Sequence, residues 1–219
     1  MGHPLWPLFD LSLRIDDLEL RPPTDDDLVE LLAVAKAGVH PPELMPFAVP
    51  WTDPPSPQFE RGFVQYYWST RAGWSVDDWN VEFGVRRQGQ MVGVQGIAAK
   101  NFATLRTVGT GSWLGQAYQR QGTGRLMRQA VLAFAFDHLG AEVATSAAFV
   151  DNTASSRVSE YIGYEPNGID RFAPRGEARE MRRYRLTLDG WRTRPRPEVG
   201  VEGLEACLDM FGVAASADK

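Results

Sequence analysis

The stretch from Trp113 to Arg125 constrains the fold of this chain more than any other part of its sequence. An apolar, strand-like run at 111–114 leads into a polar turn that contains Gly122 and Gly124, and a helical pattern follows. A strand, a glycine turn and a helix in this order direct several unpaired backbone N–H groups toward one point, at the positive end of a helix dipole. The stretch therefore predicts a phosphate-binding turn, although glycines ahead of a helix also serve as simple turn residues.

Length, composition, net charge and cysteine count limit the class of protein to which this chain can belong. The 219 residues suit one domain with short appendages, and 43% hydrophobic with 23% charged residues is typical of a soluble globular protein. A formal net charge of −5 argues against a nucleic-acid partner. The single cysteine, Cys207, excludes an intramolecular disulfide framework and cysteine-rich zinc sites. With no secretory signal and no apolar run of membrane-spanning length, we expect a cytoplasmic protein that binds neither membrane nor metal.

Hydrophobic periodicity predicts strands and helices in alternation. The expected strands cover 18–21, 79–86, 91–97, 102–114, 142–150, 169–174 and 179–188, and the expected helices start near 25, 58, 123 and 153. A mixed sheet with helices on its faces is the natural packing for this order. We expect one α+β domain over residues 1–191, with a lead-in at 1–15 and a C-terminal extension at 192–219.

Three segments outside this pattern are also informative. The loop at 38–57 is rich in proline and too apolar to be fully solvated, so we expect it to lie over the domain, either lining a binding site or as a packed structural loop. The apolar lead-in should pack on the domain or on a neighbouring subunit. The extension contains an amphipathic piece at 201–211 and then a frayed end. The lead-in and the extension together suggest a homo-oligomer.

Two motifs resemble those of the GNAT superfamily of acyl-CoA N-acyltransferases. The run Gln119-Arg120-Gln121-Gly122-Thr123-Gly124 fits the pattern (Gln/Arg)-x-x-Gly-x-(Gly/Ala), with which this family binds the pyrophosphate of acyl-CoA. About thirty positions later, Asn152-Thr153-Ala154-Ser155 and then Gly163-Tyr164 are similar to the Asn-x-x-Ser…Gly-(Phe/Tyr) signature of the RimJ/RimL-type branch. That branch includes N-terminal acetyltransferases of ribosomal proteins and enzymes that act on small amines. The resemblance covers residues 14 to 191.

The resemblance implies a fold and a binding site for acetyl-CoA or another acyl-CoA. The fold would be an α/β/α sandwich, with a mixed, mostly antiparallel sheet of about seven strands, splayed between the fourth and fifth strands and flanked by about four helices. Asn152 and Ser155 would lie in the splayed cleft, and both also suit the start of a helix. The backbone of one strand would pair with the pantetheine arm and the glycine turn would hold the pyrophosphate: Ser112, Trp113, Leu114, Gln119, Arg120, Gln121, Gly122, Thr123, Gly124 and Arg125. The side chains of Arg120, Arg125 and Arg128 would either meet phosphate oxygens or form a solvated helix face.

The reaction implied is direct attack of a primary amine on the thioester, with no covalent intermediate. It needs a neutral amine, an oxyanion donor and, in some enzymes, an acid for the leaving thiolate. Ser159 stands where some family members carry a tyrosine acid, so the resemblance makes Ser155 the candidate acid. Glu82 is a candidate general base acting through water, or else a solvated strand residue, and His40 is another candidate base.

The acyl group and the acceptor stay open at this level. The donor carries an acetyl group or a succinyl group, which an arginine facing the thioester (Arg86, Arg87, Arg106 or Arg171) would recognise. The acceptor would be a small-molecule amine or a protein N-terminus, bound between the 38–57 loop, the second helix and the closing hairpin. The lack of an obvious base favours the alternative, a non-catalytic acyl-CoA-binding or interaction protein on the same fold.

Overall fold

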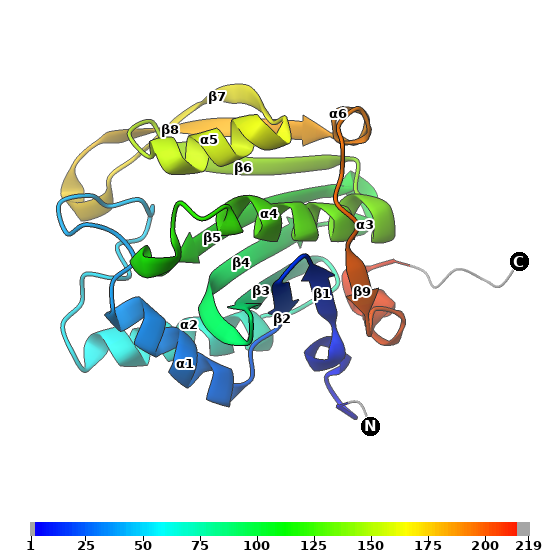
Figure 1. Cartoon of the computed structure of the whole chain (residues 1–219), viewed down its shortest axis with the longest axis horizontal. Helices are drawn as coiled ribbons and strands as arrows, with labels where there is room; N and C mark the ends of the chain where they lie inside the picture. The colour runs from blue at the N-terminus through cyan, green and yellow to red at the C-terminus, as the bar shows by residue number, and fades with distance from the viewer. Residues whose placement is uncertain (1–2, 214–219) are drawn as a thin grey trace, which may run out of the picture.

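One nine-stranded sheet runs through the protein in the order β7-β8-β6-β5-β4-β3-β2-β1-β9 (Figure 1). The computed structural model describes residues 3–213. Neighbouring strands pair antiparallel except β5 and β6, which are parallel. The mostly antiparallel mixed sheet is thus confirmed, with more strands than the seven expected. The strands are β1 (Ser12–Ile15), β2 (Leu18–Arg21), β3 (Asp78–Arg87), β4 (Gln90–Lys100), β5 (Thr107–Leu114), β6 (Val143–Phe149), β7 (Glu165–Phe172), β8 (Arg179–Thr187) and β9 (Gly200–Glu202).

The additional strands come from the two ends of the chain. The lead-in supplies β1 and the extension supplies β9, which pairs antiparallel with β1 (Figure 1). Leu8 and Leu11 of the lead-in are buried in the same core as Cys207 and Phe211 of the extension. The expected packing of the lead-in on the domain is therefore confirmed. The amphipathic piece forms β9 and a 3-10 helix, Glu205–Phe211, and the frayed end that we expected falls largely on residues 214–219, outside the described part.

Helices cover both faces of the sheet. Helices α1 (Asp25–Lys36) and α2 (Gln58–Ala72) pack on one face, where Leu31, Phe63 and Tyr67 are buried with Val94 of β4. Helices α4 (Thr123–Ala133), which continues as a π-helical turn at Phe134–His138, and α5 (Thr153–Ile162) lie side by side on the other face (Figure 1). Two short helices, α3 (Phe102–Leu105) and α6 (Leu188–Arg192), connect strands.

The strand predicted over 102–114 is wrong in its first third. Phe102–Leu105 form the short helix α3, and β5 starts only at Thr107. Asn101 and Arg106 flank this helix in left-handed conformations, with φ of 50° and 45°. The Phe102 side chain is fully buried, with its ring centroid 5.5 Å from that of Trp79. Burial of this aromatic ring against a distant strand decides the local conformation, which strand propensity does not capture.

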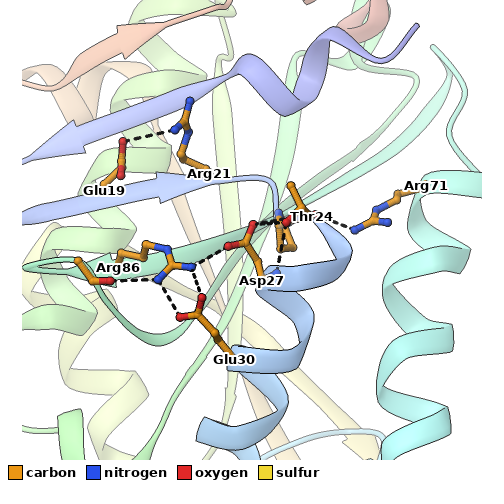
Figure 2. Close-up of polar contacts among 9 residues, drawn as sticks. Glu19, Arg21, Thr24, Asp27, Glu30, Arg71 and Arg86 are labelled. Carbon is orange, nitrogen blue, oxygen red and sulfur yellow. Dashed lines mark hydrogen bonds and ion pairs between the residues drawn. The ribbon is translucent and has the colours of Figure 1, made fainter. Parts of the chain in front are cut away.

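Helix α1 begins with a capping box and is tied to the sheet by one arginine. The Thr24 hydroxyl accepts from the Asp27 N–H and the Asp27 carboxylate accepts from the Thr24 N–H, which satisfies two N–H groups at the helix start. Figure 2 shows the guanidinium of Arg86 on β3 held between Asp27 and Glu30 of α1, at 2.7 and 2.8 Å. Burial alone would raise the pKa of Asp27, but its bonds with Thr24 and Arg86 lower the pKa below 3.8.

We expect Arg86→Gln to lower the free energy of unfolding at pH 7 by about 1–2 kcal/mol, because partly exposed charge-assisted bonds are worth only that much. A depressed carboxylate pKa contributes stability above the unfolded value of 3.8, which is lost as pH falls through the folded pKa. The variant should therefore lose less stability than the wild type as the pH falls below 3.8. Urea unfolding between pH 2 and 7 measures both effects, and an unchanged pH dependence would contradict the assignment.

No helix of residues 3–213 has both the length and the apolar character needed to cross a membrane. Within the same range, no three His, Cys, Asp or Glu side chains converge on a point where they could hold a metal ion.

Candidate functional site

The sheet opens between β5 and β6. Their parallel pairing runs from Thr107 and Val143 to Thr110 and Ser146 and then stops, although both strands continue. Beyond this vertex β5 pairs only with β4, and β6 only with β8. Exposed residues lie on both sides of the opening, in the middle of the sheet: Gly111 and Ser112 on β5 and Ala147 on β6. The predicted splay is confirmed, and its facing strand edges leave backbone N–H and C=O groups available to a ligand.

The glycine turn lies at the start of α4. Gly122 is the N-cap, with φ of 82°, a conformation that glycine adopts without strain. Its carbonyl oxygen accepts from the N–H groups of Arg125 and Leu126, at 2.9 and 3.3 Å. The N–H groups that precede them have no partner within the helix and lie at its positive end. The first turn contains no acidic residue, so this end of α4 suits an anion.

A cation from a distant hairpin reaches the same turn. The Arg87 guanidinium, at the end of β3, lies 3.3 Å from the Thr123 hydroxyl and 3.4 Å from the Gln121 amide oxygen. Asp17 holds its Nε at 2.7 Å. From the sequence, Arg87 was expected only as a partner of the acyl group. No local signal connects it with the turn, because the strand register alone brings the β3–β4 hairpin to α4.

Polar side chains of the turn also hold the surrounding chain together. The Gln119 amide donates to the carbonyl oxygens of Val39 and Leu114, at 2.7 and 2.9 Å, and so ties the turn to the 38–57 loop. Arg120 is exposed, and Arg125 lies over the Tyr161 ring with its Cζ 4.5 Å from the ring centroid. Both side chains place a guanidinium group near the N-terminus of α4.

The prediction for Arg128 is wrong. This side chain is only 3% exposed and points away from the turn toward Ser112 and Ser146, so it neither meets phosphate oxygens nor forms a solvated helix face. The other arginines considered for an acyl carboxylate are placed elsewhere. Arg86 is held by Asp27 and Glu30, Arg106 lies over the Phe102 ring, and Arg171 is exposed on β7.

The other predicted binding residues come from the two elements that flank the opening, β5 and the start of α5. Asn152 caps α5, where its side-chain oxygen accepts from the Ser155 N–H at 3.2 Å, as predicted. Ser155 is half-buried in the first turn of α5, which follows β6. On β5, Leu114 is buried under α4, whereas the Trp113 ring points to the α1 and α2 face. Strand β5 thus places Ser112, Trp113 and Leu114 on one side of the splay, and the start of α5 places Asn152 on the other side.

The candidate base Glu82 lies in register with the vertex of the splay. Glu82 on β3 is opposite Gly96 on β4, which is opposite Gly111 on β5, so all three share one face of the sheet. A Cβ at Gly96 would come within 2.9 Å of Glu82 Oε2, so the carboxylate lies directly over this glycine. A Cβ at Gly111 would meet nothing within 4 Å. Two glycines therefore leave an open path from the carboxylate to Gly111, the first residue of β5 that no longer pairs with β6.

The surroundings of Glu82 suit a general base. Its Oε1 accepts from the Tyr66 hydroxyl at 2.6 Å and from the Asn80 amide at 3.1 Å. Burial raises the pKa of Glu82 above 4.5 in spite of these two bonds. Burial and the charge of Glu82 also raise the pKa of Tyr66, which therefore stays a donor to the carboxylate. A carboxylate whose pKa moves toward neutrality is a better proton acceptor at pH 7.

His40 is engaged within the 38–57 loop. Its Nδ1 lies 2.8 Å from the Pro41 carbonyl oxygen and its Nε2 lies 2.8 Å from the Thr52 hydroxyl. Its ring packs edge-on against Phe47. With both ring nitrogens occupied inside the loop, His40 is a weaker candidate than Glu82 for the base.

The 38–57 loop lies over the domain, as predicted, and reaches the closing hairpin (Figure 1). Asp53 forms a two-bond ion pair with Arg175 at the tip of the hairpin, with both distances 2.6 Å. The Trp51 ring packs against Trp113, with 5.6 Å between ring centroids. The loop thus covers the α1 and α2 face beside β5, on the side where Glu82 lies.

Comparisons with known proteins agree with this geometry. The acetyltransferase (GNAT) domain model matches residues 17–165. Three solved structures share the fold at identities below 20%. RimL ribosomal L7/L12 alpha-N-protein acetyltransferase in complex with coenzyme A is 18% identical, with a TM-score of 0.64 over 82% of this chain and 99% of that chain. A spermidine N-acetyltransferase chimera from Vibrio cholerae and hSSAT is 17% identical, with a TM-score of 0.64 over 82% and 100%.

The third is a GCN5-related N-acetyltransferase from Brucella melitensis, which is 19% identical, with a TM-score of 0.66 over 83% of this chain and 80% of that chain. These structural likenesses concern the fold, whereas the family model rests on the sequence and matches more than half of the chain. The protein belongs to the GNAT acetyltransferase family.

Proposed function

We propose that the protein transfers an acetyl group from acetyl-CoA to a primary amine by direct attack, with no covalent enzyme intermediate. The observation that carries the proposal is the row Glu82, Gly96 and Gly111, which connects a half-buried carboxylate with the vertex of the splay. Membership of an acetyltransferase family supports acetyl-CoA as the donor. It also supports catalysis over the non-catalytic binding alternative.

Binding of the donor would use both parts of the site. The N–H groups of residues 121–124 and the Arg87 guanidinium would hold the diphosphate, since both lie at the positive end of α4. The free edge of β5 at Ser112, Trp113 and Leu114 would pair with the pantetheine amides. Asn152 and Ser155 would face the arm from α5.

Proton transfer would involve Glu82. The amine nitrogen attacks the thioester carbonyl carbon, and Glu82 takes the amine proton directly or through one water. The new C–N bond forms, the C–S bond breaks, and its electron pair stays on sulfur. The Ser155 hydroxyl, on the α5 side of the splay, would donate a hydrogen bond to the leaving sulfur. The products are an amide and coenzyme A.

The acceptor would bind over the α1 and α2 face, between the 38–57 loop, α2 and the closing hairpin. Aromatic side chains gather there, with Trp51 against Phe59, Phe63 and Trp113. A small-molecule amine or a protein N-terminus with an apolar neighbour suits these walls. The homo-oligomer expected from the lead-in and the extension would be tested by light scattering.

The experiment that tests the function follows the release of free thiol from acetyl-CoA or succinyl-CoA with a panel of polyamines, amino sugars and peptides with free N-termini. We expect amine-dependent release with acetyl-CoA, and the succinyl arm tests the other donor. Binding of CoA esters without turnover across the panel would favour the non-catalytic alternative. Failure to bind any CoA ester would reject both.

Gly96→Ala should lower kcat by about 10- to 100-fold, because displacement of a catalytic group by about 1 Å has effects of this size. The added methyl group would come within 3.2 Å of three carboxylate atoms of Glu82, which can move only away from Gly96. The matched control is Gly62→Ala on α2, where a Cβ meets nothing within 4 Å. Thiol-release kinetics on both variants check this, and equal activities would place the base elsewhere.

A further inference from the structure

Arg128 is a buried cation at the vertex of the splay. Its side chain comes from α4 and is 3% exposed. The guanidinium donates to Gln95 Oε1 on β4 at 3.4 Å, to Ser112 Oγ on β5 at 3.3 Å and to Ser146 Oγ on β6 at 2.9 Å. One side chain thus contacts three adjacent strands. Because Ser146 belongs to the last β5–β6 pair and Ser112 lies beyond it, the contact spans the point where the strands part.

No carboxylate pairs with this charge among residues 3–213. The ion pairs of the described chain involve other arginines and lysines, and the three partners of Arg128 are neutral. An arginine keeps its proton even when buried, so the positive charge is present at all working pH values. Burial of a charge without a counter-ion costs free energy that a well-packed apolar side chain would not. A buried group that costs stability in this way suggests a task outside the stability of the fold.

The titratable groups around Arg128 are tyrosines. The Tyr164 hydroxyl, at the α5–β7 connection, lies 3.3 Å from the Thr110 hydroxyl at the vertex. Burial raises the pKa of Tyr164, and the charge of Arg128 opposes this shift. Tyr184 on β8 is buried and lies opposite Ser146 in register. No hydrogen-bond partner of Arg128 among residues 3–213 is an anion. A bound anion would supply the counter-charge that these residues do not provide.

The open side of the vertex is where an anion can approach. Ser112, which accepts from Arg128, is itself exposed, so one hydroxyl separates the guanidinium from the opening. Glu82 lies on the α1 and α2 face, whereas Arg128 lies on the α4 and α5 face. The vertex thus has a proton acceptor on one face and a permanent positive charge on the other. Acyl transfer at this place develops negative charge on the thioester oxygen in the tetrahedral intermediate and then on the sulfur of the leaving coenzyme A, and only the sulfur keeps its charge after the C–S bond breaks.

We propose that Arg128 stabilises the coenzyme A thiolate as the C–S bond breaks. The inference rests on the proposed function and adds a residue to it. The electron pair of the C–S bond moves to sulfur, the amine proton goes to Glu82, and Arg128 keeps all its protons and acts by its charge alone. The Ser112 hydroxyl, held by Arg128, lies between the guanidinium and the sulfur. Electrostatic stabilisation of charge that develops in the transition state raises kcat more than it lowers KM.

The experiment titrates the thiol of coenzyme A bound to the whole protein, followed by the ultraviolet absorbance of the thiolate. A positive charge near the sulfur should lower the pKa of the bound coenzyme A thiol by about 1–2 units from the free-thiol value of roughly 8.5. Arg128→Met should abolish this shift, and Arg128→Lys should retain part of it. Arg106→Met, which removes an arginine that lies over the Phe102 ring, serves as the control and should leave the shift unchanged.

Kinetics provide the second readout. Arg128→Met should lower kcat by about 10- to 100-fold, the equivalent of one to two pKa units, with a smaller change in KM for acetyl-CoA. Thermal unfolding checks the fold, and we expect Arg128→Met to be at least as stable as the wild type because it removes a buried unpaired charge. If that variant does not fold, the wild-type titration and Arg128→Lys still decide the matter.

Three results would overturn the inference. The first is a wild-type bound thiol that titrates like free coenzyme A. The second is a shift that persists in Arg128→Met. The third is a loss of activity confined to succinyl-CoA, which would mean that Arg128 binds an acyl carboxylate. Normal turnover together with an unshifted pKa of the bound thiol rejects the role of Arg128 alone. A wild-type protein that neither binds coenzyme A esters nor turns them over rejects the proposed function.

Discussion

Glu82→Gln is expected to lower kcat/KM for the amine by about 10²- to 10³-fold, which is the usual contribution of a general base. Glutamine keeps the size of the side chain and can still accept from Tyr66 and Asn80, so the surrounding bonds at 2.6 and 3.1 Å can persist. It cannot take a proton from the amine. Thiol-release kinetics at several amine concentrations measure the loss.

The pH dependence makes the assignment specific. Burial raises the pKa of Glu82, so wild-type kcat/KM should fall as the pH drops through that raised value, and this acidic limb should vanish in the variant. The contribution of Glu82 to the free energy of unfolding has the opposite pH dependence. A raised carboxylate pKa favours folding below the unfolded value of 4.5, and this contribution is lost as pH rises through the folded pKa. The variant should therefore be at least as stable as the wild type at pH 7.

Tyr66→Phe is the matched control for this prediction. It removes the 2.6 Å bond to Glu82 but keeps the carboxylate, so we expect a smaller loss of activity and a shifted, not abolished, acidic limb. Full activity in Glu82→Gln would show that the base lies elsewhere. In that case the amine would have to lose its proton to solvent.

Gly122→Ala should raise KM for acetyl-CoA by at least tenfold, the second large effect. Gly122 has φ of 82°, and its neighbours at the start of α4 direct their N–H groups toward the expected diphosphate. A methyl group there obstructs the approach of the phosphate, and any relaxation of φ turns the N–H groups away. Binding of coenzyme A by calorimetry and KM from thiol release both report the effect.

Gly89→Ala separates backbone strain from ligand binding. Gly89, in the β3–β4 turn, also has φ of 82°, and a Cβ there meets nothing within 4 Å. Both variants should lose about 1 kcal/mol of stability, because alanine disfavours a left-handed conformation by that amount. Only Gly122→Ala should lose affinity for coenzyme A. Equal affinities in the two variants would place the diphosphate away from the turn.

Local signals in the sequence predicted much of the fold and one wall of the site. Helix α5 starts at Thr153 with Asn152 as its cap, as predicted, and β2 covers the predicted residues Leu18–Arg21. These elements depend on interactions within a few residues, namely caps, periodicity and glycine turns. Element boundaries failed where a distant contact decides the conformation, as at Phe102.

The chemistry of the vertex depends on strand register, which no local pattern specifies. Glu82 was one of two candidate bases, with His40, until the pairing of three strands placed Gly96 and Gly111 beside it. Arg87 reaches the glycine turn before α4 from the β3–β4 hairpin, and the Arg128 side chain extends from α4 toward the sheet. Each of these placements joins residues that lie far apart in the chain.

By itself, the sequence determined the acyltransferase fold, the glycine turn at Gly122 and the helix cap at Asn152, because backbone conformation and hydrogen bonding within a single turn depend on neighbouring residues. Only the tertiary structure decided which carboxylate faces the splay and which arginine is buried beneath it. The reason is physical: the side-chain face and the register of a strand are set by its partners across the sheet. The positions of Glu82 and Arg128 therefore follow from β4, β5 and β6 and not from their own neighbours in the chain.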